Sequence, residues 1–311
     1  MNKFIRAMLI TFAACLVIGG GVVIAGIALG GTLDDASVTL GDRDYNFVSH
    51  GLLKFDDEED DDEQVKTKDE TETKNEVAGV KKLSVNASEI LELDVSLKNC
   101  EMKIQTAPDD QISVTVGDGE EGYFSMSRDG DTLKLIDKRK NKNNLKTAHV
   151  VLQIPEDVAL REVDLELGAG DIEIECLEAE EISMDGGAGA LTAKRLIATQ
   201  QFEAELGVGD FSIQEAQFGQ ADIDCGVGRL EIKSCQLNGN AKISGGVGDV
   251  EIGLVGQKND FNYELSCGVG ELDVFGDSYH SLGKDKEIDN DAPYTLSLEC
   301  GMGRIEVYQA N

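Results

Sequence analysis

A short turn of the form Gly-x-Gly, followed by alternating apolar residues, occurs seven times between residues 168 and 307. The turns contain the glycine pairs Gly168 and Gly170, Gly187 and Gly189, Gly207 and Gly209, Gly226 and Gly228, Gly246 and Gly248, Gly268 and Gly270, and Gly301 and Gly303. Successive first glycines are 19, 20, 19, 20, 22 and 33 residues apart. A period near 20 residues is typical of stacked rungs, in which each rung buries its apolar face against its neighbours. We therefore predict an all-β fold, a single-stranded β-solenoid with rungs of about 20 residues, in which these glycines shape the turns.

The apolar residues of each repeat occupy alternate positions on both sides of the turn. Around Gly207 these positions hold Phe202, Ala204, Leu206, Phe211 and Ile213. Because successive side chains of a strand point to opposite faces, both runs are predicted to point inward. Each rung is thus predicted to contain two short strands that meet at a glycine corner. Residues such as Leu177, Leu196 and Leu237 supply a third, looser side.

The outward positions of the repeats are rich in acidic residues. They include Asp164, Glu166, Glu203, Glu205, Asp222, Asp224 and Glu299. Stacking in register places like charges about 4.8 Å apart, which is destabilising. The residue after the turn changes sign along the series Asp210, Arg229 and Asp249, which predicts a ladder of opposite charges between rungs. Each exposed pair contributes at most about 1 kcal/mol, so the ladder mainly fixes the register.

The first 33 residues predict a membrane anchor. Residues 7–33 form an uncharged run of 27 residues, long enough to cross a bilayer as one N-terminal transmembrane helix. Lys3 and Arg6 precede the run and Asp34 follows it, which places the N-terminus in the cytoplasm and the rest outside the cell membrane. A cleaved signal peptide is the alternative, although its apolar core is usually shorter, about 7 to 15 residues.

Three further segments follow the predicted cytoplasmic tip and anchor at 1–33. Residues 34–80 contain eight consecutive acidic residues, Asp56–Glu63, and predict a disordered, extended stalk. Residues 81–311 form the predicted solenoid, with irregular first coils and a cap at 81–160 and regular rungs at 161–311. An insert at 277–291 lengthens the last interval and is predicted to be a connector.

The composition restricts the possible partners. The formal net charge of −32 disfavours binding to nucleic acid, whose phosphates require Lys and Arg. Tryptophan is absent and aromatic residues make up 5%, so stacking platforms for sugars or bases are scarce. Cationic, metal-bearing or protein partners are favoured, and weak surface calcium binding by the acidic columns is a further expectation.

No sequence motif predicts a catalytic, cofactor or internal metal site. The Gly-x-Gly turns lack the following helix and the Lys-Ser/Thr pair of a phosphate-binding loop. They also lack the nine-residue period of a calcium-binding roll. Glu203 and Asp222 lie on neighbouring rungs, where a carbohydrate-active enzyme could carry paired carboxylates, but acidic residues on nearly every rung favour a solvated face.

Three of the seven cysteines, Cys225, Cys267 and Cys300, stand directly before a turn. This position predicts small buried apolar side chains in one inward column. Cys267 and Cys300 are expected on adjacent rungs, where a disulfide is sterically possible. Cys225 and Cys267 are expected two rungs apart, too far to form one.

The segment VVLQIPEDVALREVDLELGAGDIEI, Val150–Ile174, and the following rungs resemble the bacterial toastrack family. This family is also catalogued as an adhesin-like domain of unknown function with β-strand repeats. The resemblance extends over about residues 81–309, including the proline at Pro155 that follows a strand. It implies a domain attached to a membrane helix and associated with cell-envelope stress systems of Gram-positive bacteria. This chain departs from that pattern in its acidic stalk and in the lack of a recognisable cytoplasmic signalling domain.

The resemblance implies an assembly or sensing surface, with an envelope protein as its partner, and no catalytic residues. We therefore expect a membrane-anchored, extracytoplasmic interaction scaffold. A cell-surface adhesin that binds host or matrix material is one alternative. A carbohydrate-active enzyme is an alternative of another class.

Overall fold

The computed structural model describes residues 37–40, 43–46, 81–117, 123–139, 146–280 and 285–310. The predicted membrane anchor and most of the predicted stalk lie outside these residues. None of the helices in the described ranges is both long and apolar enough to cross a membrane. The chain divides into two units, Met1–Thr67 and Lys68–Asn311. In the first unit, Ser37–Leu40 (β1) and Arg43–Asn46 (β2) form an antiparallel pair.

The second unit contains the remaining described strands, which belong to one sheet. They are Lys81–Asn86 (β3), Glu92–Thr106 (β4), Gln111–Val116 (β5), Phe124–Asp129 (β6), Thr132–Asp137 (β7), Ala148–Ile154 (β8), Leu160–Ala169 (β9), Ile172–Ala188 (β10), Leu191–Leu237 (β11), Ala241–Leu254 (β12), Phe261–Val274 (β13), Asp277–His280 (β14), Lys286–Ile288 (β15) and Tyr294–Gln309 (β16). Two short 3₁₀ turns lie at Ala87–Glu89 and Lys258–Asp260.

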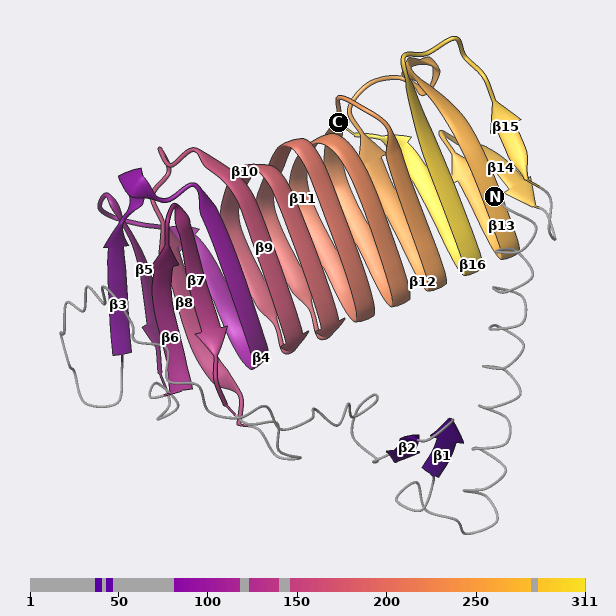
Figure 1. The fold of residues 1–311 in the computed structure, drawn as a ribbon. Helices are drawn as coiled ribbons and strands as arrows, with labels where there is room; N and C mark the ends of the chain where they lie inside the picture. The colour runs from indigo at the N-terminus through magenta and orange to yellow at the C-terminus, as the bar shows by residue number, and fades with distance from the viewer. Residues whose placement is uncertain are drawn as a thin grey trace. The chain divides into compact units, whose positions relative to one another are not determined.

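Parallel, in-register pairing between successive windings builds the solenoid (Figure 1). Ile182 of β10 pairs with Val163 of β9 on one side and with Phe202 of β11 on the other. The near-constant sequence offset of about 20 residues is therefore one winding of the chain. The all-β fold predicted from the repeat is confirmed for the described residues.

The strands differ from the prediction at the glycine corner. Two short strands per rung were expected, but β11, β12, β13 and β16 run through the corner. At the first two corners the strands do end, β9 at Ala169 and β10 at Ala188. Hydrogen bonds between rungs persist there, because the Gly170 N–H donates to the Ala188 carbonyl at 2.9 Å and the Gly189 N–H donates to Val208 at 3.0 Å. The positive φ of Gly170 and Gly189, 119° and 146°, bends the chain without breaking this pairing.

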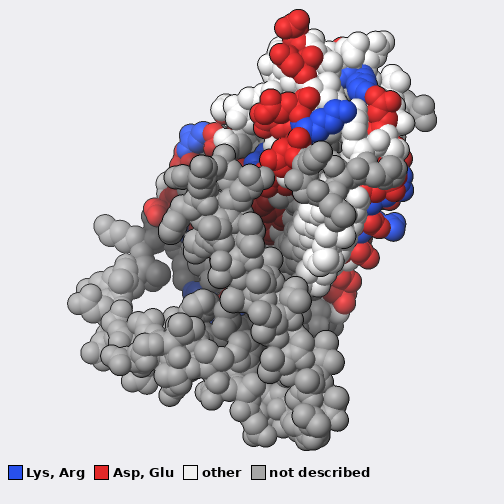
Figure 2. Space-filling view, turned by 90° about the vertical axis from the view of Figure 1, so that its right-hand side faces the viewer, with Lys and Arg blue, Asp and Glu red and all other residues white. Residues whose placement is uncertain are grey.

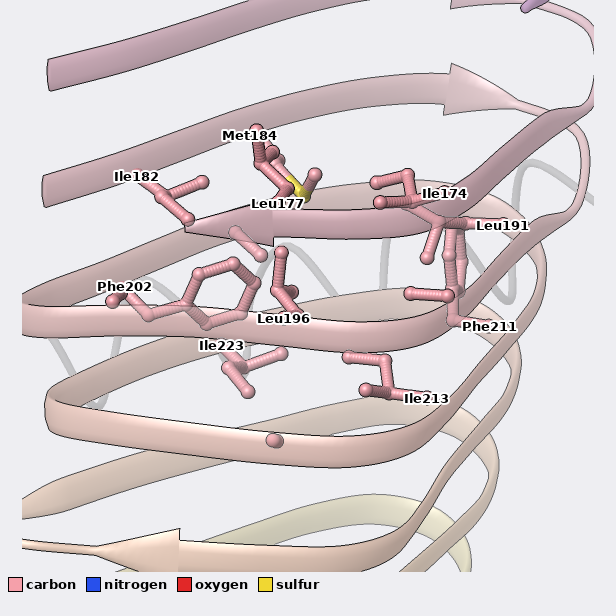
Figure 3. Packing of buried hydrophobic residues seen from close by; sticks show 14 of the residues in the cluster. Ile174, Leu177, Ile182, Met184, Leu191, Leu196, Phe202, Phe211, Ile213 and Ile223 are labelled. Atoms are coloured by element: carbon pink, nitrogen blue, oxygen red, sulfur yellow. The ribbon is translucent and has the colours of Figure 1, made fainter. Parts of the chain in front are cut away.

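A continuous apolar core fills the interior of the windings (Figure 3). The alternation predicted around Gly207 is correct, since Phe202, Ala204, Leu206, Phe211 and Ile213 are all buried. Leu177, Leu196 and Leu237 are also buried and form the third side. The rings of Phe202 and Phe218 stack with their centroids 4.4 Å apart, which links two sides of one winding through the core.

The N-terminal end of the solenoid mixes parallel and antiparallel pairs. Strand β4 pairs in parallel with β7, β8 and β9, whereas β3, β5 and β6 join the sheet through antiparallel pairs. An ion pair, Asp137 with Arg139, is buried at this end, where the Arg139 guanidinium also lies 5.1 Å from the Phe124 ring centre. Antiparallel strands that depart from the regular winding protect the first rungs from pairing with other chains.

The order of rungs at the C-terminal end was not predicted. Strand β16, the last in the sequence, lies between β12 and β13 rather than beyond β13 (Figure 1). The insert at 277–291 makes this possible, because it is not a plain connector but contains β14 and β15. Both pair antiparallel with β13 along its other edge. Strands β14 and β15 therefore cover the outer edge of β13, and the chain then runs back to place β16 between β12 and β13.

The intercalation of β16 continues the predicted charge ladder. Arg229 pairs in register with Asp249, with 4.0 Å between their charged groups. Arg304 of β16 then stands between Asp249 of β12 and Glu271 of β13. If the rungs followed the sequence, Asp249 and Glu271 would be neighbours of like charge, which is unfavourable in register.

The cysteine column is partly as expected. Cys267 and Cys300 are buried register partners on adjacent rungs, and both are free thiols. Cys225 is only half-buried. The expected separation of two rungs between Cys225 and Cys267 is wrong, because both the Gly245 rung and the Cys300 rung lie between them.

Candidate functional site

All fourteen predicted turn glycines lie at one corner, in two columns along the solenoid. A Cβ added to any first glycine would lie 2.1–2.6 Å from a carbonyl oxygen of the neighbouring rung, and at any second glycine 1.7–2.0 Å. Both are far inside contact distance, so the rungs can approach to their normal spacing only with glycine at these positions. The glycines therefore determine how the outward side chains on either side of the corner are stacked.

A third glycine column, away from this corner, was missed in the sequence. A Cβ on Gly219 would lie 2.3 Å from the Gln200 carbonyl oxygen, and one on Gly239 would lie 2.2 Å from the Gly219 carbonyl oxygen. The 20-residue interval between Gly219 and Gly239 repeats the main period and could have revealed this column.

The outward side chains of the strand segments that precede the glycine corner form what we name the acidic face. One of its columns contains Lys134, Asp94, Asp164, Ser183, Glu203, Asp222, Lys242, Ser297 and Glu264, and the next contains Ser96, Glu166, Asp185, Glu205, Asp224, Ser244, Glu299 and Ser266. Lys134 lies 3.3 Å from Asp94, and Lys242 lies 3.9 Å from Asp222. Between these two lysines Asp94 stacks on Asp164 and Glu203 on Asp222, with Ser183 separating the two pairs. In the next column the carboxylates of Glu166, Asp185, Glu205 and Asp224 follow one another without interruption.

Like charges are crowded around Asp164. Partial burial, together with the negative charges of Asp94, Asp185 and Glu166, raises the pKa of the Asp164 carboxyl. A cation brought to this face would favour the ionised carboxylates, so the face is electrostatically suited to a positively charged partner.

The opposite face of the corner differs because lysine and arginine are interleaved with its acids. Lys103 lies 3.1 Å from Glu173, and Arg304 lies 2.7 Å from Glu306. Lys194 lies 3.5 Å from Glu175. Figure 2 shows both signs of charge on the described part of the molecule, with acidic side chains predominant.

An open groove of about 450 Å³ lies on the acidic face. It is lined by Gln201, Glu203, Gln220, Ala221, Asp222, Asn240, Ala241, Lys242, Glu264, Thr295 and Ser297. Glu203 and Asp222, the carboxylates considered for an enzyme, both line it, and both are exposed to solvent. The groove is a shallow polar surface and not an enclosed pocket of the kind that usually holds a substrate.

No group of three or more metal-ligating side chains in the described ranges is arranged to hold a metal ion. The described cysteines are free thiols and unreactive by environment. Burial raises the pKa of the Cys235 thiol to about 12 and that of the Cys300 thiol to about 11. Weak calcium binding by the acidic columns stays a prediction.

The fold and its glycine columns define a parallel β-solenoid repeat protein. The family model named Toastrack DUF4097 matches residues 90–281, more than half of the chain, and the chain belongs to this family. The resemblance inferred from Val150–Ile174 and the rungs is thereby confirmed. Among curated proteins, none matches this chain.

Solved structures from several bacteria are similar over most of their length. A protein from Bacteroides fragilis described as a "putative adhesin" is 15% identical, with a TM-score of 0.39, over 73% of this chain and 96% of its own. A "putative lipid binding protein" from Parabacteroides distasonis is 14% identical, with a TM-score of 0.33 and the same coverages. A "putative cell adhesion protein" from Clostridium sporogenes is 10% identical, with a TM-score of 0.30, over 74% and 98%.

Proposed function

We propose that this protein is a non-enzymatic interaction scaffold of the bacterial cell envelope. In this proposal its N-terminal apolar segment anchors it in the cell membrane, and the solenoid lies outside the cytoplasm. The acidic face then binds a cationic segment of an envelope protein, as in a stress-sensing assembly. The observation that supports this most is the stacking of carboxylates on the acidic face, which costs stability yet recurs on successive rungs.

Neutralising the acidic face is expected to abolish partner capture. The variant E203Q/E205Q/D222N/D224N removes four negative charges at exposed positions that make no core contact. In bacterial cells that express the full chain, amine-reactive crosslinking should link the wild type to an envelope protein, and the variant should lose at least about 90% of that product, as charge complementarity governs encounter.

The matched control is E231Q/E251Q/E306Q/D273N, which removes the same charge from the opposite face. It should retain the crosslinked product. Equal yields from the wild type and both variants would contradict the proposal, and so would equal losses from both variants, since either result makes the acidic face irrelevant.

The groove favours a second candidate, direct binding of glycans as an adhesin. Its amide and hydroxyl side chains, such as Gln220, Asn240 and Ser297, are hydrogen-bonding partners for sugars. An adhesin would bind a glycan panel, and a carbohydrate-active enzyme would turn it over with loss of activity in E203Q/D222N. We expect neither result from the full chain, and turnover of that kind would replace the scaffold proposal.

A further inference from the structure

The x residues of the Gly-x-Gly turns form a line of exposed apolar side chains along the corner. We name this line the corner ridge. It consists of Val208, Val227, Val247, Met302 and Val269 on five consecutive rungs. Their exposed fractions run from 42% to 57%, and they make up five of the eight large exposed apolar residues in the described ranges. Contiguous exposed apolar surface of this kind marks interaction sites in soluble domains.

The corner itself does not require large side chains. Ala169 and Ala188 occupy the same position on the two preceding rungs and stack in register with the ridge. The glycines on either side have the same close contacts there as elsewhere. The change from alanine to valine and methionine therefore adds apolar surface that the turn geometry does not need.

Acidic residues border the ridge on both sides. On the acidic face the nearest outward column contains Glu205, Asp224 and Glu299 beside the ridge. On the other side runs the ladder of Asp210, Arg229, Asp249, Arg304 and Glu271, in which acids are in excess by one. The ridge is thus an apolar line between two borders of net negative charge.

The spacing of the ridge fits a helix better than a strand. Ridge side chains recur every 4.8 Å or so, the rung spacing, so five rungs extend over about 19 Å. On one face of a helix, side chains recur once per turn, about every 5.4 Å. A strand presents one about every 6.8 Å on one face and would lose register within two or three rungs. About 14 helical residues would cover the ridge.

We propose that the corner ridge docks a basic amphipathic helix of a protein partner, laid parallel to the solenoid axis. This inference rests on the proposed function and specifies the chemistry of the partner. The apolar stripe of the helix contacts the valines and Met302, and lysine or arginine side chains on its flanks reach the acidic borders. An anionic lipid surface is disfavoured by those borders, and a second copy would bring like charges together.

The test uses the full chain in zwitterionic lipid nanodiscs and a defined fluorescent peptide. The peptide is about 18 residues long, with leucine at i, i+3, i+4 and i+7 and lysine elsewhere. A second peptide has the same composition in scrambled order and cannot form the apolar stripe. We expect the wild type to bind the amphipathic peptide about tenfold more tightly than the scrambled one. Because both peptides carry the same charge, this difference in affinity reports the contribution of the apolar stripe.

The variant V208T/V227T/V247T keeps the β-branched shape at three consecutive ridge positions and makes them polar, which leaves only Met302 and Val269 as apolar ridge residues. It should lose that tenfold preference. Val255, which is 47% exposed and lies off the ridge, provides the control V255T, which should keep it. Circular dichroism spectra should be the same for all three chains. The border variant E205Q/D224N/E299Q should bind both peptides more weakly, and its binding should depend less on salt concentration.

Equal affinity of the wild type for both peptides, or an unchanged preference in the ridge variant, would overturn the proposal. A dimer or binding to zwitterionic vesicles that disappears in the ridge variant would also overturn it, in favour of a second copy or a lipid as the occupant. Failure here is distinguishable from failure of the scaffold function by crosslinking the ridge variant in cells. The acidic-face variant shares Glu205 and Asp224 with the ridge border but leaves the apolar side chains unchanged. Crosslinking that is lost in the acidic-face variant and retained in V208T/V227T/V247T would support the scaffold function and contradict docking on the ridge.

Discussion

Replacing Gly228 with alanine is expected to lower the free energy of unfolding by about 3 to 5 kcal/mol. The added Cβ would lie 1.8 Å from the Gly209 carbonyl oxygen, and the φ of 141° at Gly228 disfavours any L side chain. The backbone of one rung would have to move away from the next, with loss of hydrogen bonds and core contacts. Urea denaturation followed by circular dichroism measures this loss.

Two other glycines separate the effect of stacking from that of backbone conformation. Gly276 has a positive φ of 82° but nothing within 4 Å of an added Cβ, and Gly117 has open space around it as well. Gly276→Ala is expected to cost about 1 to 2 kcal/mol, and Gly117→Ala close to nothing. A cost for Gly228→Ala no larger than that for Gly276→Ala would show that close stacking at the corner is not what requires glycine.

Replacing Arg139 with methionine is expected to cost about 3 to 5 kcal/mol, because it leaves the Asp137 carboxylate buried without its partner. The Asp137 side chain is fully buried, and its oxygens accept hydrogen bonds from Arg139 Nε at 2.9 Å and Nη2 at 2.6 Å. Arg139 also donates to the carbonyls of Asn99 and Lys146, at 2.8 and 2.6 Å. Urea denaturation followed by circular dichroism measures this decrease in the free energy of unfolding.

The matched surface variant is Arg161→Met, whose ion pair with Glu92 lies at the surface and should contribute much less to stability than the buried pair. The double variant Asp137→Asn/Arg139→Met should recover part of the loss, because no buried charge remains. If Arg139→Met cost no more than Arg161→Met, the buried pair would not stabilise the N-terminal end of the solenoid.

The stability contribution of Asp137 is also expected to depend on pH. Burial alone would raise the pKa of its carboxyl, but the hydrogen bonds and charge of Arg139 and the Lys98 N–H outweigh burial and hold the pKa below its usual 3.8. Since the pKa is lower in the folded state, the contribution is present above the unfolded pKa and is lost as the pH falls through the folded value. In Arg139→Met this acid-dependent step should disappear.

The regular part of the fold could be predicted because one local rule repeats. Alternation of apolar residues gave the buried positions around Gly207, and the period gave the pairing of neighbouring windings. The position of β16 could not be derived from the period, since the sequence order of rungs does not determine their order in space. The signal that was available is the sign of Arg304, because it separates the like charges of Asp249 and Glu271 only when β16 lies between β12 and β13.

The candidate site was only partly predictable. Outward acids such as Glu203 and Asp222 follow directly from the alternation. The groove that they share with Lys242 and Ser297 depends on the order of four rungs, which alternation does not give. The corner ridge was missed because Val227 and its equivalents stand between glycines, where a single repeat gives no sign of a continuous surface.

Disulfide mapping of the C-terminal rungs tests the central claim, that in-register rungs stack along one axis with β16 between β12 and β13. Ser244 and Glu299 are register partners in the structure, whereas Ser266 lies one rung further on. Adjacent rungs bring Cα atoms to about 4.8 Å, within the range of a disulfide, and rungs two apart to about 9.6 Å, beyond it. Under mild oxidation, S244C/E299C should give the linked peptide by mass spectrometry, and S244C/S266C should not. The reverse result would place the rungs in sequence order and contradict the account.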